Sequence, residues 1–336
     1  MEKEAKFWKS LENNFVQCYL CNHKCKIGIG NRGICGVRKN INGKLFSLIY
    51  GTASSVADDP IEKKPLYHFY PGSIVLSLGT VGCNFKCLNC QNYGISTIYP
   101  ENMHVREISS EYVVKLAKDH NCKGIAWTYN EPTIWHEFTF DTSKLAKNND
   151  LYTVYVTNGY INEDALKEIA PYLDAMNIDV KAFDEKFYKN VCKAKLKPVL
   201  DTCELAKKLD IHIELTYLVI DKKNDGEKEI RDFCSWIIDR LGSDIPVHFS
   251  RFHPDYKMTD VQATPVKTLL KIYDNAKKQG LNYVYLGNVP HDTYENTYCP
   301  TCGTLLIERY GFSSLIQNIE NNRCKKCKKI IPIIGK

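Results

Sequence analysis

The sequence predicts an α/β protein built on a parallel β-sheet. From Ser73 onward, short apolar segments typical of strands alternate with longer segments that have helical periodicity. Repeated strand–helix units at this spacing form parallel sheets, because a parallel neighbour can be reached only through a crossover connection. Cysteines and polar residues also follow several of the strands, as expected where the loops at the carboxyl ends of parallel strands carry the chemistry.

Seven strands, with six helices between them, are expected in this alternating region. The strands are predicted over residues 74–78, 124–128, 152–157, 175–180, 212–219, 247–250 and 283–286. The helices are predicted over residues 110–120, 134–148, 162–172, 196–209, 227–241 and 265–279. Ser109 or Ser110 supplies an N-cap, Pro265 follows Thr264 at a helix start, and Gly280 follows a helix end. Periodicity alone leaves open whether the sheet closes into a barrel.

The composition is that of a soluble globular protein. The chain has 336 residues, of which 44% are hydrophobic and 25% are charged. This length suits one large domain with small additions, or two domains. No apolar run approaches the roughly 20 residues that cross a bilayer. The charged start of the chain lacks the apolar region of a secretory signal, so we expect a cytoplasmic protein without membrane contact.

The net charge of +6 gives little support to a nucleic-acid partner. Much of the excess lies in the basic tail over residues 323–329. A basic tail can contact nucleic acid, but no basic face interleaved with aromatic residues accompanies it. A solvated terminus is the favoured interpretation.

Fifteen cysteines in a cytoplasmic protein indicate metal binding before disulfides. Four of them, Cys122, Cys192, Cys203 and Cys234, are isolated and are interpreted as small buried hydrophobic residues. The other eleven fall into three groups, namely Cys18/Cys21/Cys25/Cys35, Cys83/Cys87/Cys90 and Cys299/Cys302/Cys324/Cys327.

The middle group follows the first predicted strand of the alternating region. Three residues separate Cys83 from Cys87, and two separate Cys87 from Cys90. Three thiolates at this spacing can bind three corners of one iron–sulfur cube and leave the fourth iron without a protein ligand. An electron-transfer cluster normally has all four irons held by cysteine, so an open iron indicates a reactive site. The alternative is a zinc site with a remote fourth ligand, although zinc knuckles usually pair two CxxC units.

The CxxxCxxC motif after the first strand of a βα repeat resembles the radical S-adenosylmethionine (SAM) superfamily. The resemblance covers most of the chain. Further segments resemble the radical SAM enzymes of the AmmeMemoRadiSam system, a subgroup similar to the pyruvate formate-lyase activating enzyme. These segments are residues 59–72, 129–132, 156–159, 177–181 and 248–254.

The resemblance implies a partial (β/α)6 TIM-like barrel that holds a [4Fe–4S] cluster on Cys83, Cys87 and Cys90. The open iron of such a cluster binds the amino and carboxylate groups of SAM. One-electron reduction cleaves SAM to methionine and a 5′-deoxyadenosyl radical, which abstracts hydrogen from a substrate. The protein orients the cofactor and excludes water and oxidants. An electron donor such as ferredoxin or flavodoxin is implied, and the enzyme is expected to be sensitive to oxygen.

Four residues after the second and third strands are implied in binding the methionine part of SAM. Asn130 and Glu131 match the segment that meets its amino group, and Glu131 is charge-matched to an ammonium. Thr157 and Asn158 match a segment near its carboxylate. Structural alternatives stay open, because Glu131 also suits a helix N-terminus and Asn158 also suits an Asn-Gly turn.

Asp179 and Lys181 alternate on the fourth strand and therefore point to the same face. Both are costly to bury unless they meet a ligand. They resemble the residues that hold the ribose and carboxylate of SAM, and a buried structural ion pair is the alternative. His248 and His253 follow a later strand and are candidates for contact with SAM or substrate, with a structural role as the alternative.

Two positions depart from the family pattern. Asn89 stands where an aromatic residue usually precedes the third cysteine, so adenine stacking is expected from Phe85 or Tyr93. Val156 stands where the activating enzymes carry an acidic residue, which disfavours a bound monovalent cation.

The two outer cysteine groups predict separate metal sites. The C-terminal group forms two CxxC knuckles 21 residues apart, the spacing of a four-thiolate zinc ribbon, with a rubredoxin-like iron as the alternative. The N-terminal group supplies four thiolates within eighteen residues. Zinc is favoured there over an auxiliary iron–sulfur cluster, and His23 is an alternate ligand. The expected division is a cysteine-rich extension (residues 1–72), a radical SAM barrel (73–296) and a zinc ribbon (297–336).

The predicted function is radical SAM chemistry on a protein or small-molecule substrate that the sequence does not identify. A narrower hypothesis is a glycyl-radical enzyme activase, although the small activases do not need the two cysteine-rich additions. A hypothesis of another class is a zinc-dependent module that binds nucleic acid or protein.

Overall fold

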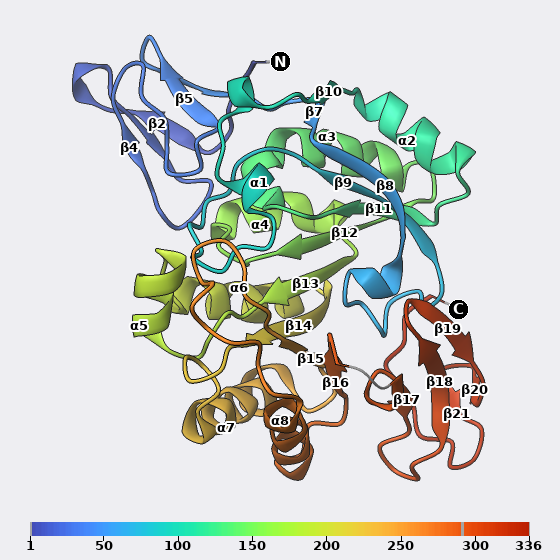
Figure 1. Cartoon of the computed structure of the whole chain (residues 1–336). Coiled ribbons are helices and arrows are strands. Elements are labelled where there is room, and N and C mark those ends of the chain that lie inside the picture. Colours follow the sequence, from blue (N-terminus) through green and yellow to red (C-terminus); the bar gives the residue numbers. More distant parts are fainter. Residues whose placement is uncertain (1, 290–291, 336) are drawn as a thin grey trace.

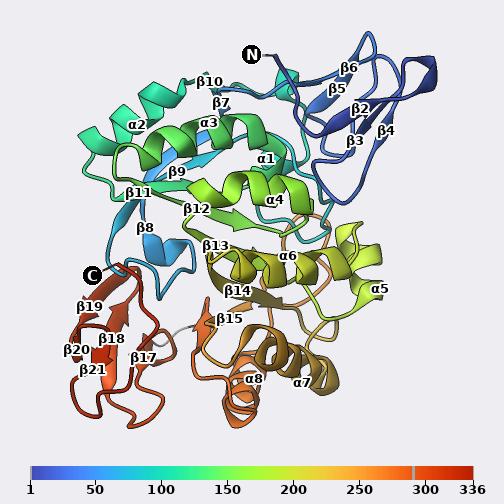
Figure 2. The same cartoon turned by 180° about the vertical axis from the view of Figure 1, so that it is seen from behind.

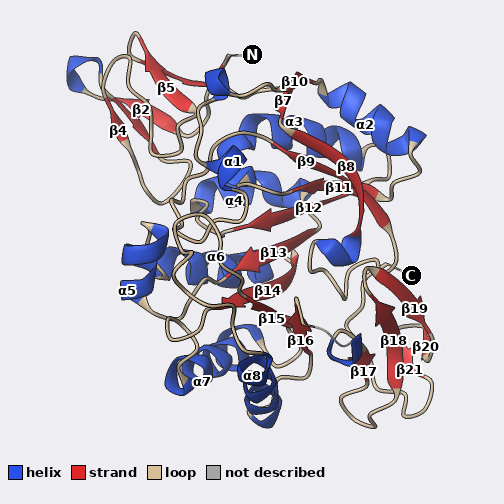
Figure 3. Cartoon of the chain, in the orientation of Figure 1, coloured by secondary structure: helices blue, strands red, loops and turns tan. Residues whose placement is uncertain are grey.

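A central sheet with two small strand-rich additions makes up the chain. The computed structural model describes residues 2–289 and 292–335 (Figure 1). Helices are concentrated around the central sheet, whereas the additions at the two ends of the chain consist mainly of strands and loops (Figure 3). No helix within the described ranges is long and apolar enough to span a bilayer.

The central sheet has eight strands among the described residues, in the order β16-β15-β14-β13-β12-β11-β9-β8. All neighbours are parallel except β8 and β9. In the described part of the chain, the edge strands β8 and β16 do not pair with each other. The strands are β8 (Ser55–Pro60), β9 (Ile74–Gly79), β11 (Gly124–Trp127), β12 (Tyr152–Thr157), β13 (Ala175–Asp179), β14 (His212–Val219), β15 (Val247–Arg251) and β16 (Val284–Gly287).

Six longer helices connect the parallel strands and cover one face of the sheet (Figure 2). They are α2 (Ser110–Asp119), α3 (His136–Lys147), α4 (Glu163–Ile169), α6 (Lys197–Lys208), α7 (Glu227–Trp236) and α8 (Val266–Lys278). Ser109 caps α2, because its hydroxyl accepts a hydrogen bond from the Tyr112 amide. The shorter helices of this region are α1 (Tyr93–Ser96), η3 (Pro100–Asn102), η4 (Pro132–Trp135), η5 (Ala170–Tyr172), α5 (Glu185–Phe187), η6 (Tyr188–Cys192) and η7 (Ile237–Leu241).

The prediction of alternating strands and helices is confirmed. Predicted strands 152–157 and 212–219 coincide with β12 and β14, and the other five agree with the structure to within a residue at each end. Two predicted helices end in other helical forms, since η5 continues α4 and the π-helical η7 continues α7. The strand β8 was not predicted.

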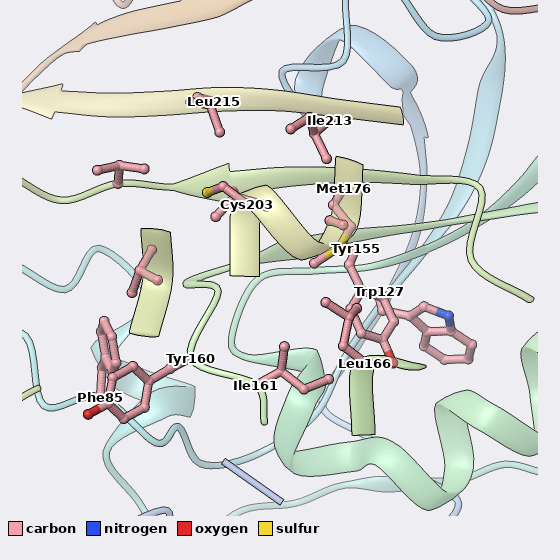
Figure 4. Close-up of a cluster of buried hydrophobic side chains, with 14 of the residues drawn as sticks. Phe85, Trp127, Tyr155, Tyr160, Ile161, Leu166, Met176, Cys203, Ile213 and Leu215 are labelled. Carbon is pink, nitrogen blue, oxygen red and sulfur yellow. The ribbon is translucent and has the colours of Figure 1, made fainter. Parts of the chain in front are cut away.

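The two faces of the sheet carry different side chains, because successive residues of a strand point to opposite faces. Met176, Ile213 and Leu215 pack toward the helices with Trp127 and Tyr155 (Figure 4). The opposite face, here called the inner face, is more polar. It presents Asn177 of β13 directly opposite Glu214 of β14. This polarity requires partners for buried groups.

Those partners come from residues 61–71, here called the plug segment, which begins with η2 (Ile61–Lys63). The fully buried Glu214 carboxylate accepts hydrogen bonds from the amides of Tyr67 (3.0 Å) and His68 (2.7 Å). The Pro65 carbonyl accepts a hydrogen bond from Asn177 at 2.8 Å. Leu66 belongs to a buried apolar cluster with residues of β9, β11, β12 and β13. The plug segment therefore fills the inner face near the amino ends of the strands.

The N-terminal addition lies at the carboxyl edge of the sheet, toward which the strand arrows point in Figure 1. Cys21 forms a β-bridge with Ile161, and the Asn22 amide donates to the Tyr160 carbonyl just beyond β12. Its strands, with the adjacent β7–β10 pair, are β1 (Lys3–Glu4), β2 (Trp8–Ser10), β3 (Val16–Cys18), β4 (Lys26–Ile27), β5 (Arg38–Ile41), β6 (Lys44–Ser47), β7 (Thr52–Ala53) and β10 (Arg106–Glu107), and η1 spans Glu12–Asn14.

The C-terminal addition lies at the opposite edge of the sheet. Its Ile334 carbonyl accepts a hydrogen bond from the Tyr70 amide of the plug segment, and its buried Arg309 donates to the Tyr67 carbonyl. Its elements are η8 (Asp292–Tyr294), β17 (Thr297–Tyr298), β18 (Leu305–Tyr310), β19 (Ser313–Ile316), β20 (Ile319–Glu320) and β21 (Arg323–Cys324). The two additions thus occupy opposite ends of the strands, while the exact division into three parts stays a prediction.

Replacing Glu214 with alanine tests the role of the plug segment. The variant leaves two buried amides and the neighbouring His248 without their acceptor, and removing one partner of such a buried pair costs about 3–5 kcal/mol. Urea unfolding at equal metal content should show a loss of this size. The exposed Glu308→Ala variant should change the free energy of unfolding by at most about 0.5 kcal/mol. Equal midpoints for both variants would contradict the assignment.

Candidate functional site

Residues 80–92, here called the cysteine loop, leave the carboxyl end of β9 and carry Cys83, Cys87 and Cys90. All three thiols are free and half-buried. The loop is fixed from one side by η6, since the amides of Lys86 and Leu88 donate to carbonyls of that helix at 3.0 and 3.1 Å. The backbone around the thiols is therefore held before any ligand binds.

The segment after β11 fixes the loop from the other side. Tyr129 has a left-handed backbone, with φ of 71°, which is unusual for a bulky residue and marks a constrained turn. Its hydroxyl donates to Asp59 at 2.6 Å. The next side chain, Asn130, accepts from the Thr80 amide at 3.1 Å and donates to the Gly82 carbonyl at 2.8 Å. Asn130 thus holds the start of the cysteine loop.

Glu131 joins the ends of β11 and β12. Its buried carboxylate accepts hydrogen bonds from the Thr133 amide, the Thr157 hydroxyl and the Asn158 amide at 2.7–2.9 Å. Burial raises the pKa of the Glu131 carboxyl, and these hydrogen bonds offset part of the rise. The hydrogen bond from Thr133 caps the N-terminus of η4. The structural alternative for Glu131, a residue at a helix N-terminus, therefore accounts for one of its three contacts.

Asn158 extends this connection to the cysteine loop. Its side-chain nitrogen, Nδ2, donates to the Asn84 side chain at 2.8 Å and lies 3.8 Å from the Cys83 sulfur. The following Gly159 has a positive φ of 68°, as the Asn-Gly turn requires. The structure therefore brings Glu131, Thr157 and Asn158 together beside Cys83.

Asp179 and Lys181 form an ion pair of 2.6 Å at the end of β13, and the two side chains are 29% and 22% exposed. Burial alone would lower the pKa of Lys181, but the charges of Asp179 and Cys87 raise it above its usual value. A hydrogen bond with the Cys192 thiol, together with burial, raises the pKa of Cys87 well above its usual range. This pair therefore lies beside the cysteine loop in an accessible position.

The two candidate histidines lie in different surroundings. His248 is buried on the inner face, where its Nε2 lies 2.7 Å from the Glu214 carboxylate and its ring packs on Tyr67. His253 is exposed, and its Nε2 lies 3.2 Å from the amide nitrogen of Gln91, the residue after Cys90. His253 borders the cysteine loop, whereas His248 belongs to the network that holds the plug segment.

The spacing of the sulfurs separates the cysteine groups into two kinds. Zinc held by four thiolates at about 2.3 Å places the sulfurs about 3.8 Å apart. The C-terminal group has such distances, with Cys299 to Cys327 at 3.4 Å and Cys302 to Cys324 at 3.7 Å. Its four sulfurs all lie within 4.8 Å of one another, and it is the one group of this kind in residues 2–289 and 292–335. The compact donor set fits a single tetrahedral ion.

Cys83, Cys87 and Cys90 are spread more widely, since their sulfurs do not form such a compact group within the described residues. Burial raises the pKa of Cys83 and Cys90, and nearby negative groups, Glu131 for Cys83 and Cys87 for Cys90, add to the rise. The three thiols therefore favour the neutral form until a cation binds. Their sulfurs are also too far apart to bind one ion together, which fits the corners of an iron–sulfur cluster.

The N-terminal group is also spread widely. Cys18, Cys21, Cys25 and Cys35 line one small apolar cavity with Ile27, Ile34 and Ile134. All four thiols are free. His23, the predicted alternate ligand, also lines the cavity, and its Nε2 lies 2.8 Å from the Asn84 carbonyl.

Several residues of the site were missed by the sequence analysis. Cys192, interpreted as a buried hydrophobic residue, lies against Cys87. Lys64 is 1% exposed and pairs with Asp59 at 2.7 Å, which in turn accepts from Tyr129. Residues 58–64 contain many charged side chains, a pattern typical of an exposed segment. Only the folded structure reveals that Asp59, Glu62 and Lys64 are buried and support the inner face.

Comparisons with known proteins agree with this geometry. A model of the radical SAM superfamily matches residues 77–234. An uncharacterized protein of Methanocaldococcus jannaschii is 50% identical over 334 residues, which is 99% of each chain. The pyruvate formate-lyase-activating enzyme of Clostridium pasteurianum is 21% identical over 201 residues, or 54% of this chain and 81% of that relative.

Two solved structures have a similar fold. A radical SAM methyltransferase from Sphaerobacter thermophilus gives a TM-score of 0.51 at 12% identity, over 70% of this chain and 71% of that one. Streptococcus suis SuiB bound to the precursor peptide SuiA gives a TM-score of 0.51 at 11% identity, over 69% of this chain and 52% of that one. At these identities the similarity concerns the α/β fold with its parallel sheet.

The role of Asn130 can be tested with the Asn130→Ala variant. The cysteine loop then loses two hydrogen bonds, each contributing about 0.5–1.5 kcal/mol. After anaerobic reconstitution with iron and sulfide, the variant should retain less iron and release it faster to a chelator than the wild type. The Asn149→Ala variant, which changes the same residue type at the end of α3, should match the wild type. Equal iron retention in all three proteins would show that Asn130 does not hold the loop.

Proposed function

The chain belongs to the radical SAM superfamily, and on that premise we propose that it abstracts hydrogen from a protein or small-molecule substrate. The observation that carries the proposal is the set of three cysteines at the carboxyl edge of the sheet. They provide ligands for three corners of a cluster, and the accessible pair Asp179–Lys181 lies beside them. A [4Fe–4S] cluster with SAM bound supplies a 5′-deoxyadenosyl radical after one-electron reduction.

We assign the residues of this edge to SAM on the basis of charge and position. The Glu131 carboxylate lies beside Cys83 and accepts three hydrogen bonds from the protein. A carboxylate can accept about four hydrogen bonds, so one acceptor position is left. The remaining position suits the ammonium of SAM. Asp179 suits the ribose hydroxyls and Lys181 suits the carboxylate of SAM. Asn130, Thr157 and Asn158 position the loop and Glu131.

The two histidines receive different roles. His253 lies beside the residue that follows Cys90 and is assigned to the rim of the site, where SAM or the substrate would pass. His248 is proposed to contribute to cofactor binding indirectly. It is hydrogen-bonded to Glu214, which in turn holds the plug segment. An electron donor of the ferredoxin or flavodoxin class would supply the reducing electron.

The framework is proposed to be a partial (β/α)6 barrel with a zinc ribbon at residues 297–336. Six strand–helix units followed by β16, with unpaired edge strands in the described chain, support the open barrel. The compact sulfurs of Cys299, Cys302, Cys324 and Cys327 support zinc. The ribbon contacts the plug segment and lies at the edge opposite the cysteine loop, so we assign it a structural role.

A glycyl-radical enzyme activase is the second candidate. The similarity to the Clostridium pasteurianum activating enzyme, over 81% of that relative's length, favours it. The third hypothesis, a zinc-dependent module that binds nucleic acid or protein, accounts for the C-terminal group but leaves the arrangement around Cys83 without a purpose.

Reductive SAM cleavage tests the proposed function directly. Anaerobically reconstituted protein with a reductant should release 5′-deoxyadenosine and methionine from SAM, measured by liquid chromatography. The Cys83→Ala/Cys87→Ala/Cys90→Ala variant should release neither, because the ligands are gone. The Cys122→Ala/Cys234→Ala variant, which changes two buried cysteines remote from the cysteine loop in sequence, should keep the activity. Release of 5′-deoxyadenosine by the triple variant at the wild-type rate would contradict the proposal.

The pair Asp179–Lys181 is tested by SAM affinity. Lys181→Met should weaken SAM binding about 10- to 150-fold, because a hydrogen bond to a charged group contributes about 1.5–3 kcal/mol. Asp179→Asn should weaken it less, and iron content should stay unchanged in both. The exposed Lys186→Met variant is the control. Unchanged SAM affinity in equilibrium dialysis would instead assign the pair to a structural role.

A further inference from the structure

The four cysteines of the N-terminal addition are spaced differently from those of the C-terminal addition. In the described residues their sulfurs do not form a compact group within 4.8 Å, in contrast to those of the C-terminal group in the same chain. Their sequence spacing also repeats the two intervals of the cysteine loop in reverse order, since two residues separate Cys18 from Cys21 and three separate Cys21 from Cys25. We propose that Cys18, Cys21, Cys25 and Cys35 bind a second [4Fe–4S] cluster, rather than zinc.

All four cysteines line one common small cavity, of about 20 Å³. The rest of its lining is mostly apolar, with Leu20, Ile27 and Ile134 among the residues. An apolar wall limits the access of water and oxidants to an iron–sulfur cluster.

Hydrogen-bond donors point toward the sulfurs. The backbone amides of Val37 and Arg38 lie near the Cys35 sulfur, and that of Ile34 lies near the Cys25 sulfur. The buried Arg38 guanidinium lies 3.7 Å from the Cys18 sulfur and pairs with the buried Glu137. Hydrogen bonds to the sulfurs stabilise thiolates and tune the reduction potential of a cluster. These groups would stabilise the thiolates of Cys18, Cys25 and Cys35 once a cation is bound.

The N-terminal cavity backs directly onto the cysteine loop. A Cβ atom at Gly82, which has φ of 90°, would lie 2.7 Å from the Cys35 carbonyl, so the two backbones touch at the residue before Cys83. His23 lies 2.8 Å from the Asn84 carbonyl, the residue after Cys83. Its ring also packs on Tyr160, which packs on Phe85. The two cysteine sites are therefore neighbours within one packed body.

This contact assigns an electron-transfer role to the N-terminal site, a part of the inference that rests on the proposed function. One electron would pass from a low-potential carrier protein to the N-terminal cluster and from there to the cluster at Cys83. Each transfer oxidises the donor and reduces the acceptor by one electron, with no bond made or broken. Residues 1–50 contain nine lysine and arginine residues against three glutamates, and the exposed Lys24 and Lys26 flank Cys25. This charge suits an acidic carrier.

Metal analysis of the full chain tests the site independently of SAM cleavage. Wild-type protein reconstituted anaerobically should contain about eight irons, about eight sulfides and about one zinc. The Cys83→Ala/Cys87→Ala/Cys90→Ala variant, whose N-terminal addition is unchanged, should keep about four irons and show an electron paramagnetic resonance signal, once reduced, that SAM does not alter. Two zincs and about four irons in the wild type, or a triple variant without iron, would overturn the second cluster.

Electron transfer is tested by comparing two reductants. The Cys25→Ser variant should lose release of 5′-deoxyadenosine when reduced flavodoxin supplies the electrons, and should keep it with dithionite, which can reduce the Cys83 site directly. The Cys122→Ser variant should behave as wild type with both. Unimpaired flavodoxin-driven release, or an equal loss with both reductants, would overturn the electron path. The iron count of the triple variant stays informative even if SAM cleavage fails in every protein.

Discussion

The buried carboxylate of Glu131 is the contact on which the candidate site depends. Removing a carboxylate from water is costly, and hydrogen bonds donated to the charged carboxylate are among the strongest means of offsetting that cost. Here the two oxygens bind donors from the end of β11 and the end of β12, and Asn158 carries the connection on to Asn84 and Cys83. Three strand ends are thereby fixed relative to one another. The cysteine loop and Thr157 take their positions from this junction.

The fold was largely predictable because local sequence and global topology agree in this chain. The strand β12 consists of β-branched and aromatic residues, and the helices α2 and α4 begin at the capping residues Ser109 and Asn162. The exception is β8. Its residues Asp58, Asp59 and Pro60 are typical of turns, yet the strand pairs antiparallel to β9, because Asp59 finds Lys64 and Tyr129 as partners on the inner face. Long-range pairing of this kind leaves no local pattern.

The residues of the candidate site were predictable where they belong to a sequence motif. They were not predictable where their role depends on a contact with a distant part of the chain. The spacing of Cys83, Cys87 and Cys90 pointed to a cluster, and the structure places Glu131, Asn158 and Lys181 around them. Sequence could not reveal that Cys192 touches Cys87, or that Asn130 holds the loop, because both contacts join segments far apart in the chain. The choice between zinc and a cluster for the N-terminal cysteines also required the sulfur positions.

The plug segment closes the inner face of the sheet near the amino ends of the strands. Glu214 binds its backbone and Leu66 packs among residues of four strands, so the end of the interior near the amino ends of the strands is filled. Any small molecule bound beside Asp179 and Lys181 must then come and go at the carboxyl edge.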